Sequence, residues 1–316
     1  RYWRDWSSDV CSSDLGLGND LLVGGVGSDV LVGGGGDDVL RGGGGDDEYV
    51  FDADEVLGTD VVDELAGAAG GTDVLSFAST TSVGVSVNLG ITTTQVVAPG
   101  RLSIRITDAN AVENAVGGDG DDSLVGNGAN NVLTGGRGSD FLDGAGGSGD
   151  TVREERDANM VASGTVLAGT LTVGVETDTL ARVEVLDLRG GASNNVLDAT
   201  GFAGDVMLWG LGGDDQLYGG AGNDRLYGGA GDDLLRGNGG NDWMAGEQGN
   251  DLYYFDQSEP QGLDVVFEPP LMGFGDRLAG VGVSGIDVDL YSNVMQVIGP
   301  NLTLWLPFAG TIEFSP

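Results

Sequence analysis

The chain has 316 residues, a formal net charge of −37, 61 glycines, a single cysteine and no histidine. Its 13 basic residues are all arginines, so lysine is absent as well. These absences exclude histidine-based nucleophile systems, histidine metal ligands, Schiff-base lysines and Walker-type phosphate loops. So large a negative charge argues against a nucleic-acid partner, and no run of about 18 apolar residues predicts a membrane span.

The first fifteen residues differ in character from the rest of the chain. They read RYWRDWSSDVCSSDL and resemble the translation of a short-read sequencing adapter. We therefore expect residues 1–15 to lie outside the fold, as an artificial tail would. The only cysteine, Cys11, belongs to this stretch, so no disulfide is expected in the remainder.

A nine-residue repeat carries the main signal of the sequence. From Gly24 the chain reads GGVGSDVLV, GGGGDDVLR and GGGGDDEYV, and from Gly210 it reads GLGGDDQLY, GGAGNDRLY, GGAGDDLLR, GNGGNDWMA and GEQGNDLYY. A weaker block begins at Gly117, and a single degenerate copy begins at Gly190. The template is G-G-x-G-x-D-x-U-x, in which U is apolar. Its sixth position is aspartate at Asp20, Asp29, Asp38, Asp47, Asp122, Asp140, Asp215, Asp224, Asp233, Asp242 and Asp251.

The spacing of this template has a chemical explanation. Glycines permit positive φ and a close backbone approach, so a six-residue turn can aim its carbonyl groups inward. The last three residues favour a short strand whose apolar side chain points to the core, and two repeats would complete one coil. Carbonyl and carboxylate oxygens, without nitrogen or sulfur, suit Ca²⁺, which takes 6–8 oxygen ligands. We expect the ion between a turn and the equivalent turn one coil later.

The repeat resembles the haemolysin-type calcium-binding repeat, also called the repeats-in-toxin (RTX) nonapeptide, over about a third of the chain. The resemblance implies an all-β fold with parallel β-roll segments that alternate with β-rich inserts, and it implies export by type I secretion. It gives the ligand role to the eleven aspartates and to carbonyl groups of Gly25, Gly27, Gly34, Gly36, Gly220, Gly222, Gly229 and Gly231. If repeats i and i+2 form one site, about six calcium sites are expected.

Three positions depart from the template. Asparagine replaces aspartate at Asn131 and Asn195, and Asp150 falls one place late in its repeat. We expect these turns to bind calcium weakly or not at all.

The segments between the blocks alternate in polarity, which predicts half-buried strands. Residues 83–89 and 102–106 show this pattern. No segment shows a convincing helical period, and residues 153–160 are the only stretch that could accommodate a short helix. A longer repeat offset by 204 residues aligns the first block and its insert with the third block and its insert, so that Asp60 corresponds to Asp264 and Glu64 to Glu268. We expect a fragment of a longer, elongated array.

These observations predict a division of the chain into seven parts. After the adapter-like residues 1–15 we expect nonapeptide blocks at 16–51, 117–152 and 210–254, and β-rich inserts at 52–116, 153–209 and 255–316, the last a truncated copy of 52–113.

The expected function is calcium binding that folds a secreted or cell-surface bacterial repeat protein, as a structural or adhesive module with a possible extracellular ligand. The acidic pairs fall on the metal-binding period, so they give no separate sign of catalysis and no enzyme activity is expected. The alternative is the C-terminal calcium-binding, secretion-assisting part of an extracellular enzyme or toxin. A long upstream array of the 204-residue unit would favour the first; an upstream metalloprotease or lipase motif would favour the second.

Overall fold

The computed structural model describes residues 12–14, 16–64, 70–256, 262–267, 277–281, 296–299, 302–305 and 313–314. Within these ranges the regular secondary structure is entirely β, which confirms the all-β class. The stretch 153–160, the only one that could accommodate a short helix, lies between and within strands β15 (Thr151–Glu155) and β16 (Met160–Thr165) and contains no helix. The described part of the chain contains no helix that could cross a membrane.

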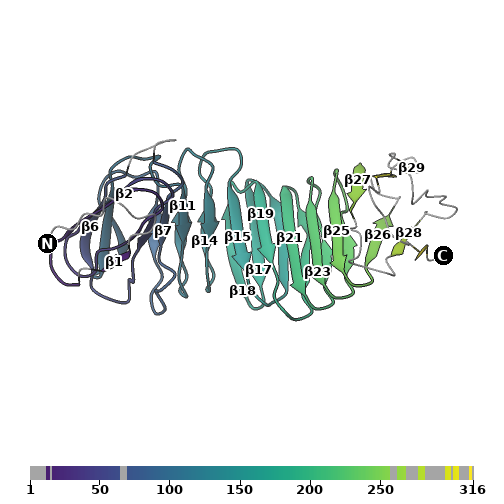
Figure 1. Cartoon of the computed structure of the whole chain (residues 1–316), viewed down its shortest axis with the longest axis horizontal. Coiled ribbons are helices and arrows are strands. Elements are labelled where there is room, and N and C mark those ends of the chain that lie inside the picture. The colour runs from purple at the N-terminus through teal and green to yellow at the C-terminus, as the bar shows by residue number, and fades with distance from the viewer. Residues whose placement is uncertain are drawn as a thin grey trace. The chain divides into compact units, whose positions relative to one another are not determined.

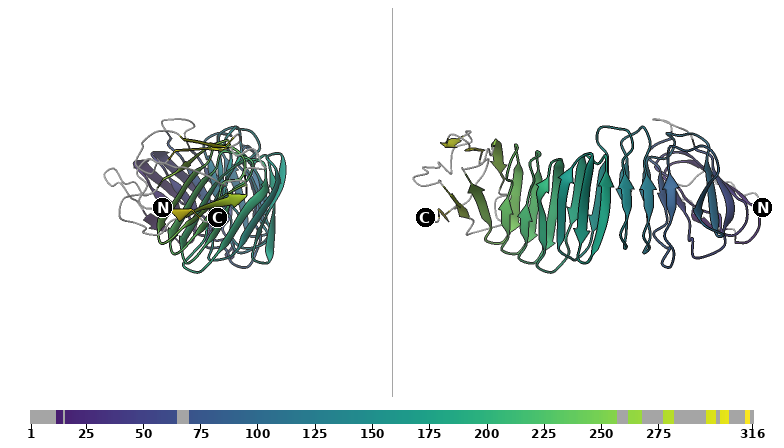
Figure 2. Two further views of the ribbon diagram at one scale, coloured as in Figure 1. Left: turned by 90° about the vertical axis from the view of Figure 1, so that its right-hand side faces the viewer. Right: turned by 180° about the vertical axis from the view of Figure 1, so that it is seen from behind.

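The chain forms two compact units. Unit 1 comprises Arg1–Arg153 and Glu176–Val183, and unit 2 comprises Glu154–Val175 and Glu184–Pro316. Within each unit, short strands stack side by side in parallel, as the ribbons of Figures 1 and 2 show.

Unit 1 contains three rows of stacked strands. The first row, in spatial order, is β1 (Ser12–Asp14), β3 (Val30–Val32), β5 (Glu48–Val50), β7 (Val74–Ser76), β11 (Asn114–Val116), β13 (Val132–Thr134) and β15. The second row is β2 (Leu21–Val26), β4 (Val39–Gly44), β6 (Gly58–Val62), β10 (Leu102–Ile106) and β9 (Gln95–Ala98). The third row is β8 (Ser86–Asn88), β12 (Ser123–Val125), β14 (Phe141–Asp143) and β18 (Glu176–Ala181).

Unit 2 contains two rows. One is β19 (Val185–Arg189), β21 (Asp205–Gly212), β23 (Arg225–Ala230), β25 (Trp243–Gln248), β27 (Leu263–Val266), β30 (Leu302–Trp305) and β29 (Gln296–Gly299). The other is β31 (Glu313–Phe314), β28 (Arg277–Val281), β26 (Leu252–Asp256), β24 (Leu234–Arg236), β22 (Gln216–Tyr218), β20 (Val196–Phe202), β16 and β17 (Ala168–Val173).

The adapter-like stretch is not wholly outside the fold. Strand β1 lies within it and pairs in parallel with β3, with Ser13 opposite Leu31. The backbone of Ser12–Asp14 thus extends the first row by one strand, while the assignment of residues 1–15 to a translated adapter stays a prediction. Cys11 lies outside the described residues.

The coil has the length that the nonapeptide period predicts. Parallel partners in the repeat blocks are eighteen residues apart, as Leu22 is from Leu40 and Leu217 is from Leu235. Two nonapeptides therefore make one coil, and each apolar eighth residue stacks on the equivalent residue of the next coil. These side chains are buried, because successive residues of a strand point to opposite faces and the eighth residue faces inward.

The inserts continue the same coils instead of forming separate domains. In the first insert, Leu75 of β7 stacks on Tyr49 of β5, and Val87 of β8 stacks on Leu124 of β12. Their inward residues are apolar and buried like those of the repeats, so the core continues while the spacing along the chain becomes irregular. Strands β10 and β16 stack in parallel on β6 and β20, and β9 and β17 pair with them in the antiparallel direction.

Candidate metal centres

The aspartates at the sixth repeat position form buried rows along the stacked turns. In unit 2 the backbone N–H of Asp215 donates to Oδ1 of Asp233 at 2.8 Å, and the N–H of Asp233 donates to Oδ1 of Asp251 at 2.9 Å. The N–H of Asp224 likewise donates to Oδ1 of Asp242 at 2.9 Å. Each carboxylate therefore uses one oxygen to hold the turn of the preceding coil.

Unit 1 builds the same rows. Backbone N–H groups of Asp20 and Asp29 donate to Oδ1 of Asp38 and Asp47, each at 2.8 Å. In the second block, the N–H of Asp122 donates to Oδ1 of Asp140 at 2.8 Å. All eleven predicted aspartates lie in such a row, and all are buried, with at most 6% of the residue exposed.

The fifth position forms a second row that faces solvent and runs in the opposite direction. The N–H of Asp232 donates to Oδ1 of Asp214, and the N–H of Asn250 donates to Oδ1 of Asp232. Asparagine and aspartate serve equally here, since only one acceptor oxygen is used. Position five therefore accepts hydrogen bonds at the solvent-facing side of the turns, whereas position six does so in the buried part.

Several buried carboxylates keep one oxygen without a hydrogen-bond donor. The oxygen without a donor is Oδ2 in Asp38, Asp47, Asp73, Asp215, Asp233 and Asp242. A buried, charged oxygen without a partner costs several kcal/mol, so it indicates a ligand that the chain itself does not supply.

The first glycine of each repeat borders these oxygens. A Cβ on Gly228 would lie 2.3 Å from Oδ2 of Asp233 and 2.8 Å from the carbonyl oxygen of Gly246. A Cβ on Gly24 would meet Oδ2 of Asp29 at 2.4 Å and the carbonyl oxygen of Gly42 at 2.7 Å. A carboxylate oxygen and a carbonyl oxygen of the next coil thus converge beside the first glycine, where any side chain would displace them.

Burial raises the pKa of the six carboxyl groups whose Oδ2 has no donor. Desolvation is the largest cause at each one, and neighbouring acids add to it at Asp242, whose pKa rises to about 8. The pKa of Asp47 rises to about 7 for the same reasons, and that of Asp224 to about 7. Buried acids such as Asp47, Asp233 and Asp242, whose Oδ2 has no donor, fit a bound cation, and their oxygen-only donor set fits calcium.

The second position of the repeat divides the turns into two classes. In the turns that we call open, this residue has a left-handed backbone; in the turns that we call closed, it does not, and its N–H donates to the side chain at position six. Open turns contain Asp20, Asp29, Asp38, Asp47, Asp140, Asp215, Asp233, Asp242 and Asp251. Closed turns contain Asp122, Asn131, Asn195 and Asp224.

The second residue has a left-handed backbone in some open turns even though it is not glycine. Leu211, Asn238 and Glu247 have φ of 73°, 70° and 72°. A left-handed backbone is unfavourable by about 1–2 kcal/mol for such residues, so the stacked coils impose it.

The carbonyl groups of the predicted glycine ligands and those of the first-position glycines have different neighbours in the structure. Carbonyl oxygens of Gly25, Gly27, Gly36, Gly222 and Gly231 face the α-carbon of the glycine one coil later. Carbonyl oxygens of first-position glycines, among them Gly42, Gly228, Gly237 and Gly246, lie beside the aspartate carboxylates, and the ligand role of the predicted glycines stays a prediction. The repetition of glycine at position one was the available signal for these, because a site that needs a carbonyl oxygen next to Oδ2 cannot accept a Cβ there.

Further acids extend the rows beyond the repeats. Asp60 continues the row of Asp38, Asp73 that of Asp47, Asp178 that of Asp140 and Asp264 that of Asp242. The sequence analysis missed them because their spacings of 22, 26, 38 and 22 residues depart from the eighteen-residue coil. The correspondence of Asp60 with Asp264 in the longer repeat was the one signal that could have found two of them.

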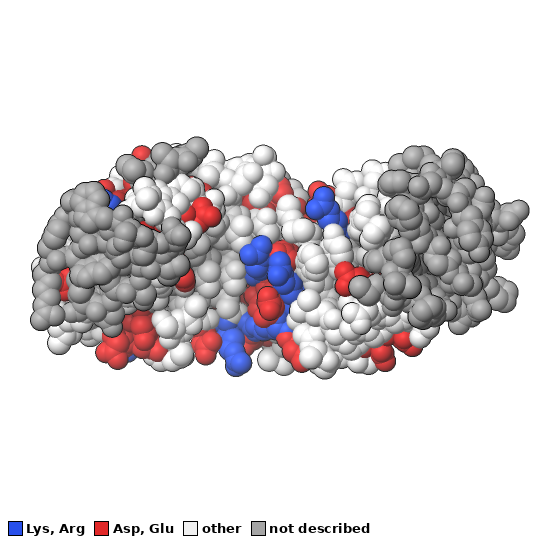
Figure 3. All heavy atoms as spheres, in the orientation of Figure 1, with Lys and Arg blue, Asp and Glu red and all other residues white. Residues whose placement is uncertain are grey.

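The arginines neutralise other acids. Arg41 pairs with Asp63, Arg182 with Asp143, and Arg156 with Glu154. On the face drawn in Figure 3, arginine side chains lie beside acidic ones within a surface that is otherwise acidic or uncharged. These pairs give the three acids a countercharge within the chain.

Stacked parallel coils with glycine-rich turns and buried carboxylate oxygens define a parallel β-roll with cation-binding turns. The model of the RTX calcium-binding nonapeptide repeat matches the chain four times, at residues 14–49, 116–150, 190–226 and 218–253. These segments are therefore haemolysin-type calcium-binding repeats, and the chain is a repeat module that binds calcium. No curated protein matches the chain.

Proposed function

We propose that calcium binding drives the folding of this module, and that the module is a structural or adhesive part of a secreted or cell-surface bacterial protein without catalytic activity of its own. The observation that carries the proposal is the set of buried open-turn carboxylates, of which Asp233 and Asp242 each keep Oδ2 without a donor. Without a cation these acids repel one another and resist burial.

The expected energies support calcium-dependent folding. Extracellular calcium-binding modules bind the ion at about 10⁻⁴–10⁻³ M. At ten times the dissociation constant each site stabilises the folded state by about 1.4 kcal/mol, so six sites contribute about 8 kcal/mol. That sum is comparable to the whole stability of a typical domain. The module would therefore stay unfolded at low intracellular calcium, which suits type I export, and would fold outside the cell.

A structural or adhesive array is favoured over the calcium-binding part of a secreted enzyme or toxin. The 204-residue sequence repeat joins a block and its insert into one larger unit, as in proteins built from many such units. The sequence upstream would distinguish the two, since a metalloprotease or lipase motif there would indicate the second.

The test is far-UV circular dichroism of the full chain during a calcium titration that starts in chelator. We expect the β signal to appear between about 10⁻⁴ and 10⁻³ M calcium. The variant Asp233→Asn/Asp242→Asn keeps both Oδ1 acceptors and removes two buried charges, and we expect it to bind fewer ions. The control Asp214→Asn/Asp232→Asn removes the same charge from exposed positions of the same block and should bind the wild-type number. A chain that is folded in chelator and indifferent to calcium contradicts the proposal.

A further inference from the structure

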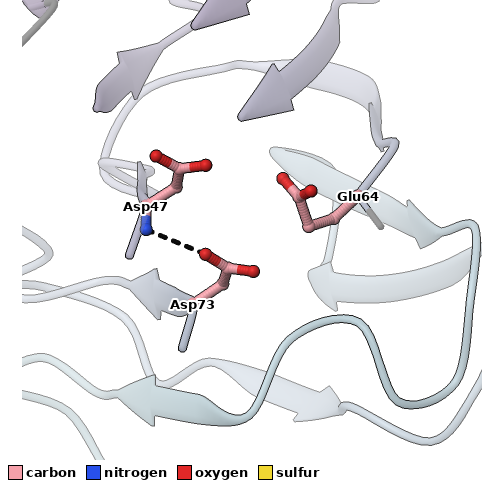
Figure 4. A group of neighbouring side chains, drawn as sticks. All are labelled: Asp47, Glu64 and Asp73. Atoms are coloured by element: carbon pink, nitrogen blue, oxygen red, sulfur yellow. Dashed lines mark hydrogen bonds between the residues drawn. The ribbon is translucent and has the colours of Figure 1, made fainter. Parts of the chain in front are cut away.

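Three buried acids meet where the first nonapeptide block passes into its insert. Asp47 ends the last turn before β5, Glu64 follows β6, and Asp73 precedes β7. One oxygen from each lies within 4.8 Å of those of the other two. Figure 4 shows the three carboxylates facing a common space, with Glu64 on the opposite side from the two aspartates.

Glu64 takes the place of a missing turn. One coil earlier, the space beside Gly24 is bordered by Oδ2 of Asp29 and by the carbonyl oxygen of Gly42. Beside Gly42 itself, a Cβ would lie 2.1 Å from Oδ2 of Asp47 and 2.6 Å from Oε2 of Glu64. A glutamate oxygen therefore stands where the next nonapeptide would have supplied a carbonyl oxygen.

The chain holds Glu64 in this position. Its Oε2 accepts a hydrogen bond from the N–H of Gly43 at 3.0 Å and another from the phenol of Tyr49. The Tyr49 oxygen in turn accepts from the N–H of Gly42 at 2.8 Å. The glutamate thus reaches the turn in a fixed orientation, which a chance surface acid would not have.

The two aspartates keep oxygens aimed at the same space. Their exposed fractions are 1% for Asp47 and 0% for Asp73, and Oδ2 of each has no hydrogen-bond donor. Oδ1 of Asp73 is already used by the N–H of Asp47 at 2.8 Å, and the N–H of Asp73 is bound by Glu113 at 2.9 Å. Burial, together with the charges of Glu64 and neighbouring acids, raises the pKa of Asp73 to about 8 and that of Asp47 to about 7.

We propose that Asp47, Glu64 and Asp73 form a calcium site at the junction, separate from the sites built by pairs of nonapeptide turns, that closes the β-roll where the repeat ends. Two oxygens bound to one Ca²⁺ at 2.3–2.6 Å can be at most about 4.6–5.2 Å apart, and the three carboxylates meet this limit as they stand. Three acids around one divalent ion leave a net charge of −1, which the hydrogen bonds to Glu64 help to balance.

The test compares Glu64→Gln with Glu55→Gln in the full chain. Both remove one negative charge from the same insert, but Glu55 is exposed while Glu64 is buried. Equilibrium dialysis against ⁴⁵Ca²⁺ should give one ion fewer for Glu64→Gln than for the wild type, and the wild-type number for Glu55→Gln. Circular dichroism of the same samples at saturating calcium reports whether each variant is folded.

A second variant covers the case in which Glu64→Gln does not recover the β signal. Glu64→Asp keeps the charge but withdraws the carboxylate by one methylene, and we expect one site to weaken at least tenfold. A folded variant of either kind that binds the wild-type number of ions with unchanged affinity overturns the junction site. The site rests on the proposed function, yet the two fail differently: a wild type that binds no calcium removes both, whereas equal binding by wild type and Glu64→Gln removes the junction site alone.

Discussion

Two neighbouring turns of the third block have almost the same sequence and different structures. Residues 219–224 read GGAGND and residues 228–233 read GGAGDD, so they differ only at the solvent-facing fifth position. In the first, the N–H of Gly220 donates to Oδ2 of Asp224 at 2.6 Å. In the second, Gly229 has a φ of 109° and Oδ2 of Asp233 has no donor.

The preceding coil accounts for this difference. The turn of Asp233 stacks on another nonapeptide turn, that of Asp215, whereas the turn of Asp224 stacks on Val206, which belongs to the insert. The closed turn of Asp122 likewise follows an insert residue, Val85. The turns of Asp122 and Asp224, which stack on insert residues, are therefore closed, whereas those of Asp140, Asp233 and Asp242, which stack on nonapeptide turns, are open.

The turns with asparagine show how closure replaces a cation. Oδ1 of Asn131 accepts from the N–H of Asn127 at 2.8 Å, while its Nδ2 donates to the carbonyl oxygen of Glu113 at 2.5 Å. Asn195 accepts from the N–H of Gly191 at 2.8 Å and donates to Asp157 at 3.2 Å. An amide supplies a donor where a carboxylate would need an ion, so these turns are complete without calcium.

The largest effect is expected where a side chain would enter the space beside an open-turn carboxylate. Gly228→Ala would bring a Cβ to 2.3 Å from Oδ2 of Asp233, and we expect a loss of about 1–3 kcal/mol from overpacking in addition to weaker calcium binding. Gly212→Ala is the matched control, because its nearest neighbour would be 3.8 Å away and its φ is ordinary. Urea denaturation at saturating calcium measures both, and equal stabilities would contradict the geometry of the open turn.

The variant with the next largest expected effect, Asn131→Asp, tests whether the stability of a closed turn is independent of calcium. In Asn131→Asp, one carboxylate oxygen would face the carbonyl oxygen of Glu113 instead of donating to it, and we expect a loss of about 1–2 kcal/mol. Because the N–H of Asn127 still points to residue 131, the loss should not change as calcium rises.

The control for Asn131→Asp introduces the same negative charge at the neighbouring residue, Asn130. Asn130 is exposed, and its Oδ1 accepts from the N–H of Ser148, which an aspartate would preserve. Asn130→Asp should therefore be close to neutral. A deficit in Asn131→Asp that disappears as calcium rises would show instead that this turn binds the ion and that the two classes are not functionally distinct.

Much of the fold follows from the sequence because the repeat specifies it locally. The period of nine fixes the coil of eighteen residues, and the alternation around Leu226 or Leu235 fixes which side chains enter the core. The buried aspartate rows follow from the same period. These features need only the repeat itself and the geometry of a strand.

Other features depend on neighbours that the sequence does not display. The second position is glycine in the turn of Asp224 (Gly220) and also in the turn of Asp233 (Gly229). The residue type therefore does not decide its backbone conformation, which is set by the preceding coil. Glu64 joins Asp47 and Asp73 only because an irregular insert returns to the stack. Glu64 lies 17 residues and Asp73 lies 26 residues after Asp47, and neither spacing is the eighteen residues of a coil. A search for the nonapeptide repeat therefore could not identify Glu64 and Asp73 as residues that replace a repeat at its boundary.

The smallest effect tests whether stacking imposes the open conformation. Leu211 occupies the second position of the turn of Asp215 with a φ of 73°, and its side chain is 46% exposed. Leu211→Gly removes the left-handed strain while it loses little apolar burial, so we expect a gain of up to about 1 kcal/mol.

The control for Leu211→Gly is glycine at an ordinary strand position. Val161 is similarly exposed, at 47%, and lies within β16, and its backbone is not left-handed. Val161→Gly should lose about 0.5–1 kcal/mol, the usual effect of glycine in a strand interior. Thermal unfolding of both variants at saturating calcium would give shifts of opposite sign. If Leu211→Gly also destabilises, the left-handed backbone is no strain in this turn, and the open class must be held by the leucine side chain instead of by the coil on which it stacks.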